Sequence, residues 1–452
     1  MHTSKILLAA VVSALSSGSL TCCADNPVVQ TKFTADPAPL VVGDTVYLFT
    51  SHDEDDAHGF HMLNWLGYSS KDMVNWTDHG VVASLATFPW AVQNNDAWAP
   101  QVVERDRKFY LYVPISVSGW PKNVIAVAVA DNPLGPFKDA LGRPLIEKGN
   151  GYIDPTAFVD DDGQAYLYFG NPNAWFVRLN KDMISYSGEV AKAEGKPRNY
   201  QEGPWIYKRD GHYYLAYAST CCPEGIGYAM STNPAGPWEF KGNIMDGNKL
   251  SSGNHPGIID FKGKSYVFGF NYKLNWEITA VHRERRSVCL AELTYNADGT
   301  IQKLPWWNDE GVAQIGKFNP YEQVEAATIC YEKGVKSKPR GEGQPGVYVS
   351  VSENDACIKV KGVDFGSNGA TNFIARVATP ADGGTIALRL DSEVGIPIGA
   401  LKVKSTGALG KWETQSCKIS GARGVHDLYF KFFGTNAATM NVDWWKFEQV
   451  RY

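Results

Sequence analysis

A short motif occurs five times in the N-terminal part of the chain. Each copy opens with an acidic, aromatic or histidine residue next to or near a proline, and an apolar strand that contains tyrosine follows about a dozen residues later. The five openings are Asp36-Pro37, Trp98-Ala99-Pro100, Asp154-Pro155, Glu202-Gly203-Pro204 and His255-Pro256. The copies recur roughly every 50 to 60 residues, a period typical of repeated supersecondary units. A fold for this chain must therefore place the five units in equivalent positions.

Each of the five units reads as a set of short strands separated by tight turns. Dipeptides typical of β-hairpin turns stand between the alternating apolar and polar runs. They are Gly43-Asp44, Asp162-Gly163, Asp210-Gly211 and Lys262-Gly263. Five units of about four strands each are typical of a β-propeller. A large irregular β-sandwich is the alternative, but it would not account for the regular recurrence.

The repeat ends near residue 318, although the strand pattern continues. Later segments such as residues 383–392 and 426–432 still alternate and are bounded by glycine, asparagine and aspartate. About 130 residues of this kind are typical of a β-sandwich. The chain of 452 residues is also too long for one typical core. We therefore predict an all-β protein, with a five-bladed β-propeller over residues 25–318 and a β-sandwich (jelly-roll) domain over residues 319–452.

Residues 1–24 have the composition of a signal peptide. A lysine precedes an apolar run over residues 6–15 that is too short to span a bilayer, and small residues follow it. Leu20-Thr21-Cys22-Cys23 has a weak similarity to a bacterial lipoprotein box, so lipid anchoring stays open. We expect an exported protein, secreted, periplasmic or attached to the cell surface, with no transmembrane segment. Export permits disulfide bonds, and Cys221 and Cys222 form either a vicinal disulfide or two free thiols.

The overall charge argues against nucleic acid as a partner. The formal net charge is −5 and the isoelectric point is near 6.0, which provides no basic surface for phosphate groups. Aromatic residues make up 12% of the chain. Such residues pack well in strands, and their faces also stack on the C–H faces of sugars. We expect a monomer whose composition fits a carbohydrate binder.

Three of the five openings carry a carboxylate, namely Asp36, Asp154 and Glu202. Because a propeller gathers equivalent positions of its blades around one axis, we expect these acids to lie in one site. A single acid before proline is more often a turn former, but three at matched positions favour chemistry. Hydrolysis of a glycosidic bond needs one carboxylic acid to protonate the leaving oxygen and one carboxylate to activate water. A third carboxylate can raise the pKa of the acid and orient it.

The first domain resembles glycoside hydrolase family 43 over its whole length. The matching segments are Phe33-Thr34-Ala35-Asp36-Pro37, Tyr152-Ile153-Asp154-Pro155-Thr156-Ala157-Phe158, Gln201-Glu202-Gly203-Pro204-Trp205 and Asn254-His255-Pro256-Gly257. The resemblance implies a five-bladed propeller and an inverting mechanism. It implies that Asp36 is the general base, Glu202 the general acid, and Asp154 the residue that modulates the acid's pKa and orients it. We expect the carboxyl groups of Asp36 and Glu202 to lie roughly 6.5–9.5 Å apart, since about 5 Å would indicate retention.

Three further residues are candidates for substrate binding. His255 opens the fifth repeat, and in family 43 the matching histidine lies at the propeller axis, often near a water-coordinated calcium ion. It is therefore also a candidate metal residue. Arg286 resembles an arginine that reaches the family's substrate pocket, with an exposed basic cluster at residues 283–286 as the alternative. Trp98 occupies the second opening and forms either a wall for the sugar or part of the core.

Two acidic runs are better explained without a metal. The run His52-Asp53-Glu54-Asp55-Asp56 follows a strand as a blade connection would, and such runs are usually solvated. We expect it to be exposed and to shape the rim of the pocket. Residues 160–163 fit a hairpin turn and lack the acid spacing of an EF-hand loop.

The second domain is similar to family 6 carbohydrate-binding modules. The similarity lies in Val363-Asp364-Phe365-Gly366, Arg389-Leu390-Asp391-Ser392, His426-Asp427-Leu428-Tyr429 and Asn441-Val442-Asp443-Trp444-Trp445. The resemblance implies a structural calcium ion. Glu325 and Asp443 match two of its ligands, while Ala327 stands where a second acid is common.

The resemblance also implies a sugar-binding cleft at the end of the sandwich. Members that bind sugar there usually carry aromatic rings where this chain has Cys357 and Leu409. Asn441 remains, but a sugar would lack its stacking partners. We therefore expect a packing or spacer role for this domain rather than strong binding in the end cleft.

These features predict an exported inverting glycoside hydrolase that releases terminal α-L-arabinofuranosyl residues from arabinoxylan. An exo-β-1,4-xylosidase of the same family is the nearest alternative, and an arabinanase is a further one. A non-catalytic propeller that binds carbohydrate is the alternative from another class, but binding alone would not need all three acids. The expected partners are plant cell-wall polysaccharides, arabinoxylan and xylan. No cofactor is required for the chemistry, and calcium is expected at the propeller axis and in the second domain.

Overall fold

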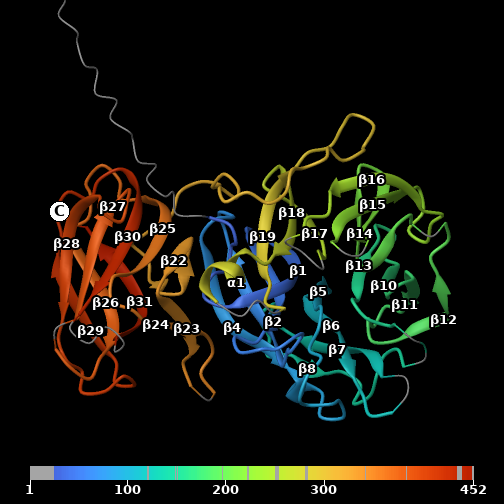
Figure 1. Cartoon of the computed structure of the whole chain (residues 1–452), viewed down its shortest axis with the longest axis horizontal. Coiled ribbons are helices and arrows are strands. Elements are labelled where there is room, and N and C mark those ends of the chain that lie inside the picture. The colour runs from blue at the N-terminus through green and yellow to red at the C-terminus, as the bar shows by residue number, and fades with distance from the viewer. Residues whose placement is uncertain are drawn as a thin grey trace, which may run out of the picture.

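The protein consists of two β-domains arranged side by side (Figure 1). The structure is a computed structural model that describes residues 25–119, 122–147, 149, 151–195, 197–220, 223–249, 254–279, 284–341, 343–382, 384–434 and 440–449. The predicted signal peptide, with Cys22 and Cys23, and the pair Cys221-Cys222 lie outside the described residues.

Five antiparallel sheets of consecutive strands form the first domain. The first blade contains β1 (Phe33–Val42), β2 (Thr45–Asp53), β3 (Asn64–Ser70) and β4 (Trp76–Ser84), and the second contains β5 (Gln101–Arg105), β6 (Lys108–Ser116), β7 (Asn123–Ala130) and β8 (Lys138–Asp139). The third contains β9 (Thr156–Val159), β10 (Ala165–Phe169), β11 (Trp175–Leu179) and β12 (Tyr186–Lys192), and the fourth contains β13 (Tyr200–Arg209), β14 (His212–Ser219), β15 (Gly225–Ser231) and β16 (Glu239–Met245). The fifth contains β17 (Gly257–Phe261), β18 (Lys264–Asn271) and β19 (Ser287–Leu293). The first strands, β1, β5, β9, β13 and β17, contact one another in a closed ring. The predicted five-bladed β-propeller is confirmed.

Alternation along single strands explains how the blades pack. In β10, Leu167 and Phe169 belong to the core shared with the second blade, whereas Tyr166 and Tyr168 belong to the core shared with the fourth blade. Successive side chains of a strand point to opposite faces, so both faces of this blade are buried. This is why the strands read as nearly continuous apolar runs with tyrosine.

The start of the described chain completes the fifth blade. The backbone N–H of Val28 donates to the carbonyl of Val288 in β19 at 2.9 Å. The side chain of Asn26 bonds with the backbone of Leu290 in both directions, at 2.9 and 3.0 Å. Residues just before the first blade therefore cover the edge of the last blade and close the ring.

Two facing sheets form the second domain. One contains β23 (Val335–Pro339), β24 (Val347–Val351), β31 (Met440–Glu448), β26 (Asn372–Ala378) and β29 (Glu413–Lys418), with β20 (Val324–Glu325) paired to β31; the other contains β22 (Tyr331–Lys333), β25 (Ala356–Asp364), β30 (Val425–Phe433), β27 (Gly384–Leu390) and β28 (Ile396–Val403). One apolar core of alternating residues from both sheets lies between them. The predicted β-sandwich is confirmed.

The two domains are joined by strand pairing and buried polar contacts. The short strand β21 (Thr328–Ile329) pairs with β4 and extends the first blade. Asp78 in that blade accepts hydrogen bonds from Lys32 at 2.9 Å and from Ser337 of the second domain at 2.6 Å. Asp25 accepts a hydrogen bond from Lys359 at 3.1 Å. The second domain is thereby a fixed neighbour of the first blade.

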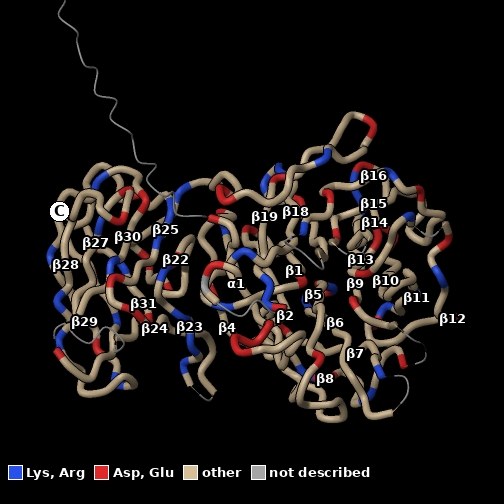
Figure 2. Tube along the Cα trace, viewed as in Figure 1, with Lys and Arg blue, Asp and Glu red and all other residues tan. Residues whose placement is uncertain are grey.

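Charges of both signs are interspersed over the two domains (Figure 2). The helical segments are short, namely η1 (Leu85–Thr87) and α1 (Lys273–Ile278). No helix within the described ranges combines the length and the apolar character needed to cross a membrane.

Candidate active site

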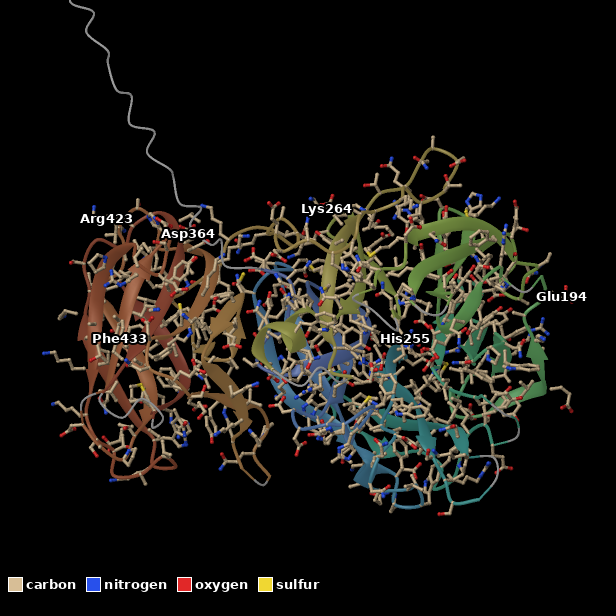
Figure 3. All side chains as sticks on the ribbon, viewed as in Figure 1. Glu194, His255, Lys264, Asp364, Arg423 and Phe433 are labelled. Carbon is tan, nitrogen blue, oxygen red and sulfur yellow. The ribbon has the colours of Figure 1, made fainter. Side chains whose placement is uncertain are left out.

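The five openings of the repeat meet at the propeller axis. Their prolines line one small pocket. These prolines are Pro37, Pro100, Pro155, Pro204 and Pro256. Asp36, Asp154 and His255 line the same pocket, and His255 lies near the centre of the propeller in Figure 3. One atom each of Asp154, Glu202 and His255 lie within 4.8 Å of one another. The structure therefore brings together the three acids and the histidine.

Asp36 and Asp154 share an unusual backbone conformation at matched places in their blades. Their φ angles are 53° and 56°, in the left-handed region that aspartate tolerates better than most residues. The pairing of β1 with β2 shifts its register between Ala35 and Ala38, and the pairing of β13 with β14 shifts around Glu202. Bulges of this kind re-aim a side chain. They place Asp36 and Glu202 at the axis instead of in the regular alternation of the strands, whereas Asp154 lies just before β9.

The imidazole ring of His255 stands between two of the acids. Its Nδ1 lies 3.2 Å from Asp36 Oδ1, and its Nε2 lies 3.3 Å from Glu202 Oε1 and 3.9 Å from Asp154 Oδ2. A Cβ on Gly203 would lie 2.7 Å from the ring, which explains glycine after Glu202. Burial lowers the pKa of His255, but the three carboxylates together raise it to about 10. The ring is therefore an imidazolium whose two nitrogens donate to the acids on either side.

Asp36 is held as a carboxylate. Ser51 Oγ donates to its Oδ2 at 2.5 Å, and Arg286 Nη1 donates to its Oδ1 at 3.0 Å. Burial opposes ionisation, but the charges of Arg286 and His255 and these hydrogen bonds hold the pKa of Asp36 below its usual value. An ionised carboxylate beside the pocket can act as a general base.

Asp154 and Glu202 differ in their affinity for a proton. Burial raises the pKa of Asp154 to about 7 against the attraction of His255, and the charges of Glu202 and Asp36 add to the rise. Burial also acts on Glu202, but the hydrogen bond and charge of His255, with a hydrogen bond from Asn171, hold its pKa below the usual value. Two carboxyl groups this close titrate as a pair. Below about pH 7 the pair therefore holds one proton, mainly on Asp154.

Arg286 is fixed by an acid that the sequence predicted to be solvated. Its Nε and Nη2 donate to the two oxygens of Asp53, both at 2.9 Å, and the rings of Phe60 and Phe270 lie 5.1 and 5.0 Å from its guanidinium group. Arg286 is 5% exposed and Asp53 is fully buried. The expectation of an exposed run is therefore wrong at Asp53, and so is the alternative of an exposed cluster at Arg286. Asp53 lies two residues after Ser51 on β2, so strand alternation is the signal that could have placed it near the axis.

Trp98 contributes to the wall between blades rather than to the acid cluster. Its side chain packs against the core that contains Trp65 and Ala97. Its carbonyl accepts a hydrogen bond from Trp65 Nε1 at 2.6 Å. The neighbouring Ala99 and Pro100 line the axial pocket. Of the two roles predicted for Trp98, these contacts support packing.

Two polar residues of the site carry no signal in the repeat. Asn171, after β10, donates from Nδ2 to Glu202 Oε2. Glu224, before β15, is 1% exposed and accepts a hydrogen bond from the backbone N–H of Asn254 at 3.2 Å. Burial, with the charge of Glu202, raises the pKa of Glu224 to about 8. Neither residue stands at an opening, and the sequence offered no motif for them.

The axial histidine does not suit direct coordination of a metal. Asp154, Glu202 and His255 are close enough to surround a cation. However, a protonated imidazole has no lone pair for a metal ion. Calcium prefers oxygen ligands and waters. A calcium ion near His255 stays a prediction, and it would have to be held through carboxylate oxygens and water.

The residues of the second domain do not fit the expected calcium site. Arg340 donates from Nε to Asp443 Oδ1 at 2.7 Å and from Nη2 to Glu325 Oε2. Arg376 Nη1 donates to the other oxygen of Asp443 at 2.6 Å. The guanidinium group of Arg340 supplies the positive charge between the two carboxylates. These contacts engage Glu325 and Asp443 in ion pairs and do not support a role as metal ligands, which stays a prediction.

Cys357 and Leu409 stand at the two positions of the second domain where the sequence predicts that an aromatic platform is missing. Cys357 is fully buried, and Leu409 is 40% exposed. Asn441 is itself buried and donates to the carbonyl of Leu409 at 3.1 Å. Its amide is therefore engaged within the protein.

Comparison with known proteins relates both domains to carbohydrate-active families. The model of glycosyl hydrolases family 43 matches residues 24–301, and that of carbohydrate binding module family 6 matches residues 325–449. An arabinoxylan arabinofuranohydrolase from Paenibacillus polymyxa is 34% identical over 93% of this chain and 74% of its own length. A xylosidase/arabinosidase from Bacteroides ovatus is 32% identical over 61% of this chain and 95% of its own length.

A solved structure shares the two-domain arrangement. It is a glycoside hydrolase family 43 arabinoxylan arabinofuranohydrolase from Bacillus subtilis in complex with cellotetraose. The TM-score is 0.83 and the identity 31%, with 94% of this chain and 98% of that chain covered. The similarity therefore extends over the propeller and the sandwich together.

Proposed function

Because the chain belongs to glycosyl hydrolase family 43, we propose that it releases terminal α-L-arabinofuranosyl residues from arabinoxylan or its oligosaccharides. The observation that carries this proposal is the cluster of Asp36, Asp154 and Glu202 around His255. It occurs in a chain that is similar to arabinoxylan arabinofuranohydrolases along both domains. Hydrolysis in this family inverts configuration and needs no cofactor.

The reaction uses two acids on opposite sides of the scissile bond. Glu202 gives its proton to the glycosidic oxygen as the bond from that oxygen to the anomeric carbon breaks. A water molecule attacks the anomeric carbon from the other face, and Asp36 takes up the proton that this water loses. The products are free arabinose and a main chain that keeps a hydroxyl group.

The imidazolium of His255 supports the inverting geometry. It stands between Asp36 and Glu202, with one nitrogen on each, and so keeps the two carboxyl groups from touching. An inverting pair needs its two carboxyl groups to be separated, because the attacking water must fit between the base and the sugar. The separation of roughly 6.5–9.5 Å between these carboxyl groups stays a prediction.

Asp154 supplies the proton that the general acid needs. The side chain of Asp154 is 5% exposed, whereas that of Glu202 is 20% exposed. A bound sugar displaces water from Glu202, and loss of water favours its neutral form. The shared proton then moves from Asp154 to Glu202, next to the leaving oxygen.

Replacement of Glu202 by glutamine tests this mechanism. We expect Glu202→Gln to lower arabinose release from arabinoxylan by about a hundredfold or more, because the amide has no proton to give. Thermal unfolding should stay unchanged, since the shape of the side chain is kept. Glu239→Gln, at an exposed position of the same blade where Glu239 pairs with Lys241 at 2.8 Å, is the matched control. Unchanged turnover by Glu202→Gln would eliminate this role.

An exo-β-1,4-xylosidase is the second candidate, because the relative from Bacteroides ovatus is a xylosidase/arabinosidase. Rates on an aryl α-L-arabinofuranoside and an aryl β-xyloside separate the two candidates. Faster turnover of the arabinofuranoside, with arabinose as the product from arabinoxylan, supports the main proposal. Faster turnover of the xyloside supports the alternative.

We also propose that the enzyme is exported as a monomer and works on plant cell-wall polysaccharide. The signal-like residues 1–24 support export. Cell fractionation and size-exclusion chromatography test these two points. The second domain then has a packing or spacer role, and retardation of the isolated domain by xylan in affinity electrophoresis would contradict it.

A further inference from the structure

We propose that Asn171 is a positioning residue for proton transfer. Its amide holds Glu202 in place and stabilises the carboxylate that Glu202 becomes when it gives up its proton. This inference rests on the proposed function, because it concerns the step in which Glu202 acts as general acid. Four observations carry it. Asn171 contacts Glu202, and hydrogen bonds tie the loop of Asn171 to the segments before Asp154 and Glu202. Two glycines allow this loop to approach closely, and the two oxygens of Glu202 have different donors.

The loop that carries Asn171 is tied to the segment that leads to Asp154. The backbone N–H of Asn171 donates to the carbonyl of Gly151 at 2.9 Å, and the N–H of Gly170 donates to the carbonyl of Ile153 at 2.7 Å. Ile153 directly precedes Asp154 in the chain. A shift of this loop would therefore also shift Asp154.

The same loop is tied to the segment that leads to Glu202. The hydroxyl group of Tyr200 donates to the carbonyl of Gly170 at 2.7 Å. Tyr200 is buried, and it lies two residues before Glu202 at the start of β13. The loop thus connects the strands of the third and fourth blades where both acids emerge. Asn171 is placed with reference to both carboxylates.

Two glycines allow this close approach. Gly151 and Gly170 have φ angles of 73° and 122°, values that other residues rarely adopt. A Cβ on Gly151 would collide with the carbonyl oxygen of Asn171, and a Cβ on Gly170 would collide with the carbonyl oxygen of Asn173. A side chain at either glycine position would therefore prevent the close backbone packing of this loop. An ordinary surface turn would not need two such positions.

The two oxygens of Glu202 have different donors. Oε1 faces Nε2 of His255 at 3.3 Å, while Oε2 accepts the hydrogen bond from Asn171. Among the residues that the structure describes, Asn171 is the one that donates a hydrogen bond to Oε2. Because His255 is already shared with Asp36 and Asp154, Asn171 is the neutral partner dedicated to Glu202. Its loss would leave one oxygen of the nascent carboxylate without a protein donor.

A donor to the charged form of an acid lowers the pKa of that acid. As Glu202 transfers its proton, negative charge grows on the carboxyl group and the hydrogen bond from Asn171 strengthens. The amide therefore stabilises the transition state more than the ground state, which is the condition for a contribution to rate. This contribution grows with the need of the leaving group for a proton.

Replacement of Asn171 tests the proposal by pH profile and leaving group. Activity requires a protonated acid, so it falls as the pH rises through the pKa of the Asp154–Glu202 pair. Without the donor the pKa of Glu202 rises, and we expect the alkaline limb of kcat/KM in Asn171→Ala to move up by about one pH unit. For arabinoxylan, kcat/KM should fall by about tenfold. For a nitrophenyl arabinofuranoside, whose leaving group needs little protonation, the loss should be under about threefold.

A second variant covers the case in which the alanine variant does not fold. Asn171→Asp keeps the shape of the side chain but places a further carboxyl group beside Glu202, so it should move the alkaline limb in the same direction. Asn173→Ala in the same loop is the matched control and should leave both the limb and the ratio of the two substrates unchanged. Equal losses on both substrates with an unmoved limb would overturn the proposal. Failure of the function itself would look different, since the unmodified enzyme would then release no arabinose from either substrate.

Discussion

Charged contacts between distant parts of the chain hold each reacting group in a defined protonation state. Asp36 is ionised because Arg286 and His255 face it, and Arg286 can stay buried because Asp53 accepts two of its hydrogen bonds. A buried charge of this kind depends on a complete set of partners. We therefore expect Asp53 to act on the reaction through Arg286 and not by contact with the sugar.

Removal of the charge on Asp53 should weaken both stability and activity. We expect Asp53→Asn to lower the free energy of unfolding by about 3 kcal/mol, because it leaves part of a buried guanidinium group unpaired. The reorientation of Arg286 should also lower kcat/KM by at least about tenfold. Urea unfolding and turnover of an aryl arabinofuranoside measure the two effects.

A control lies in the same pair of strands. Asp44 pairs with Lys71 at 3.2 Å with both side chains about two thirds exposed, and exposed pairs of this kind contribute little. Asp44→Asn should leave both measurements unchanged. A stable and fully active Asp53→Asn enzyme would show that Arg286 keeps its place without this partner.

The three acids could be predicted from sequence, whereas their partners could not. Asp36, Asp154 and Glu202 recur in register with the repeat, so the symmetry of the fold places them together. The contact of Asp53 with Arg286 could not be predicted, because Asp53 lies in an acidic run that is typical of exposed loops. Asn171 reaches the site from a loop after β10 and follows no repeated position. Pairing between side chains of different blades depends on packing, which periodicity alone does not describe.

In the second domain, one arginine side chain contacts both carboxylates that the sequence predicts as calcium ligands. Arg340 lies between β23 and β24 and reaches Glu325 on β20 and Asp443 on β31. The sequence motif matched the carboxylates, but it contained no sign of the arginine, which is far from Asp443 in the chain. The motif alone therefore does not reveal that these carboxylates have a counter-charge within the protein.

The ion pairs of Arg340 predict a domain whose stability does not depend on calcium. Addition of a chelator should leave the melting temperature unchanged, because the carboxylates are already neutralised. Arg340→Met should lower the melting temperature by several degrees, since it removes a partner from the buried Asp443. Scanning calorimetry with and without chelator measures both effects.

Arg423→Met is the matched control in the same domain. Arg423 is exposed (Figure 3), so this change should have little effect on melting. A clear fall of the melting temperature on chelation in the unmodified protein would show that a cation, and not Arg340, supports this site.

At the scale of the whole molecule, strand pairing and buried polar contacts join the two domains. Strand β21 continues the first blade, and Asp25 and Asp78 of the propeller have partners in the second domain. The individual folds could be predicted because each has its own pattern of strands. Their junction could not, since β21 is only two residues long and the polar contacts, a hydrogen bond and an ion pair, join residues more than 250 positions apart.

This junction predicts cooperative unfolding of the intact chain. Calorimetry should show one transition, because neither domain can unfold without exposing buried carboxylates of the interface. Lys359→Met, which leaves Asp25 with one partner fewer, should lower the transition temperature by several degrees. Two well-separated transitions in the unmodified protein would contradict a shared interface of this strength.

The position of Asp25 bears on how the enzyme is presented in the cell. Its carboxylate is buried and bonds with Lys359 and with the thiol group of Cys330 at 3.2 Å, both in the second domain. Asp25, the first described residue, therefore lies at the seam between the two domains. A lipid on Cys22 or Cys23 would be two or three residues away from Asp25, at most about 10 Å along an extended chain, and we propose that it would hold the seam near the membrane. Attachment would then orient the sugar pocket relative to the cell surface as well as retain the enzyme there.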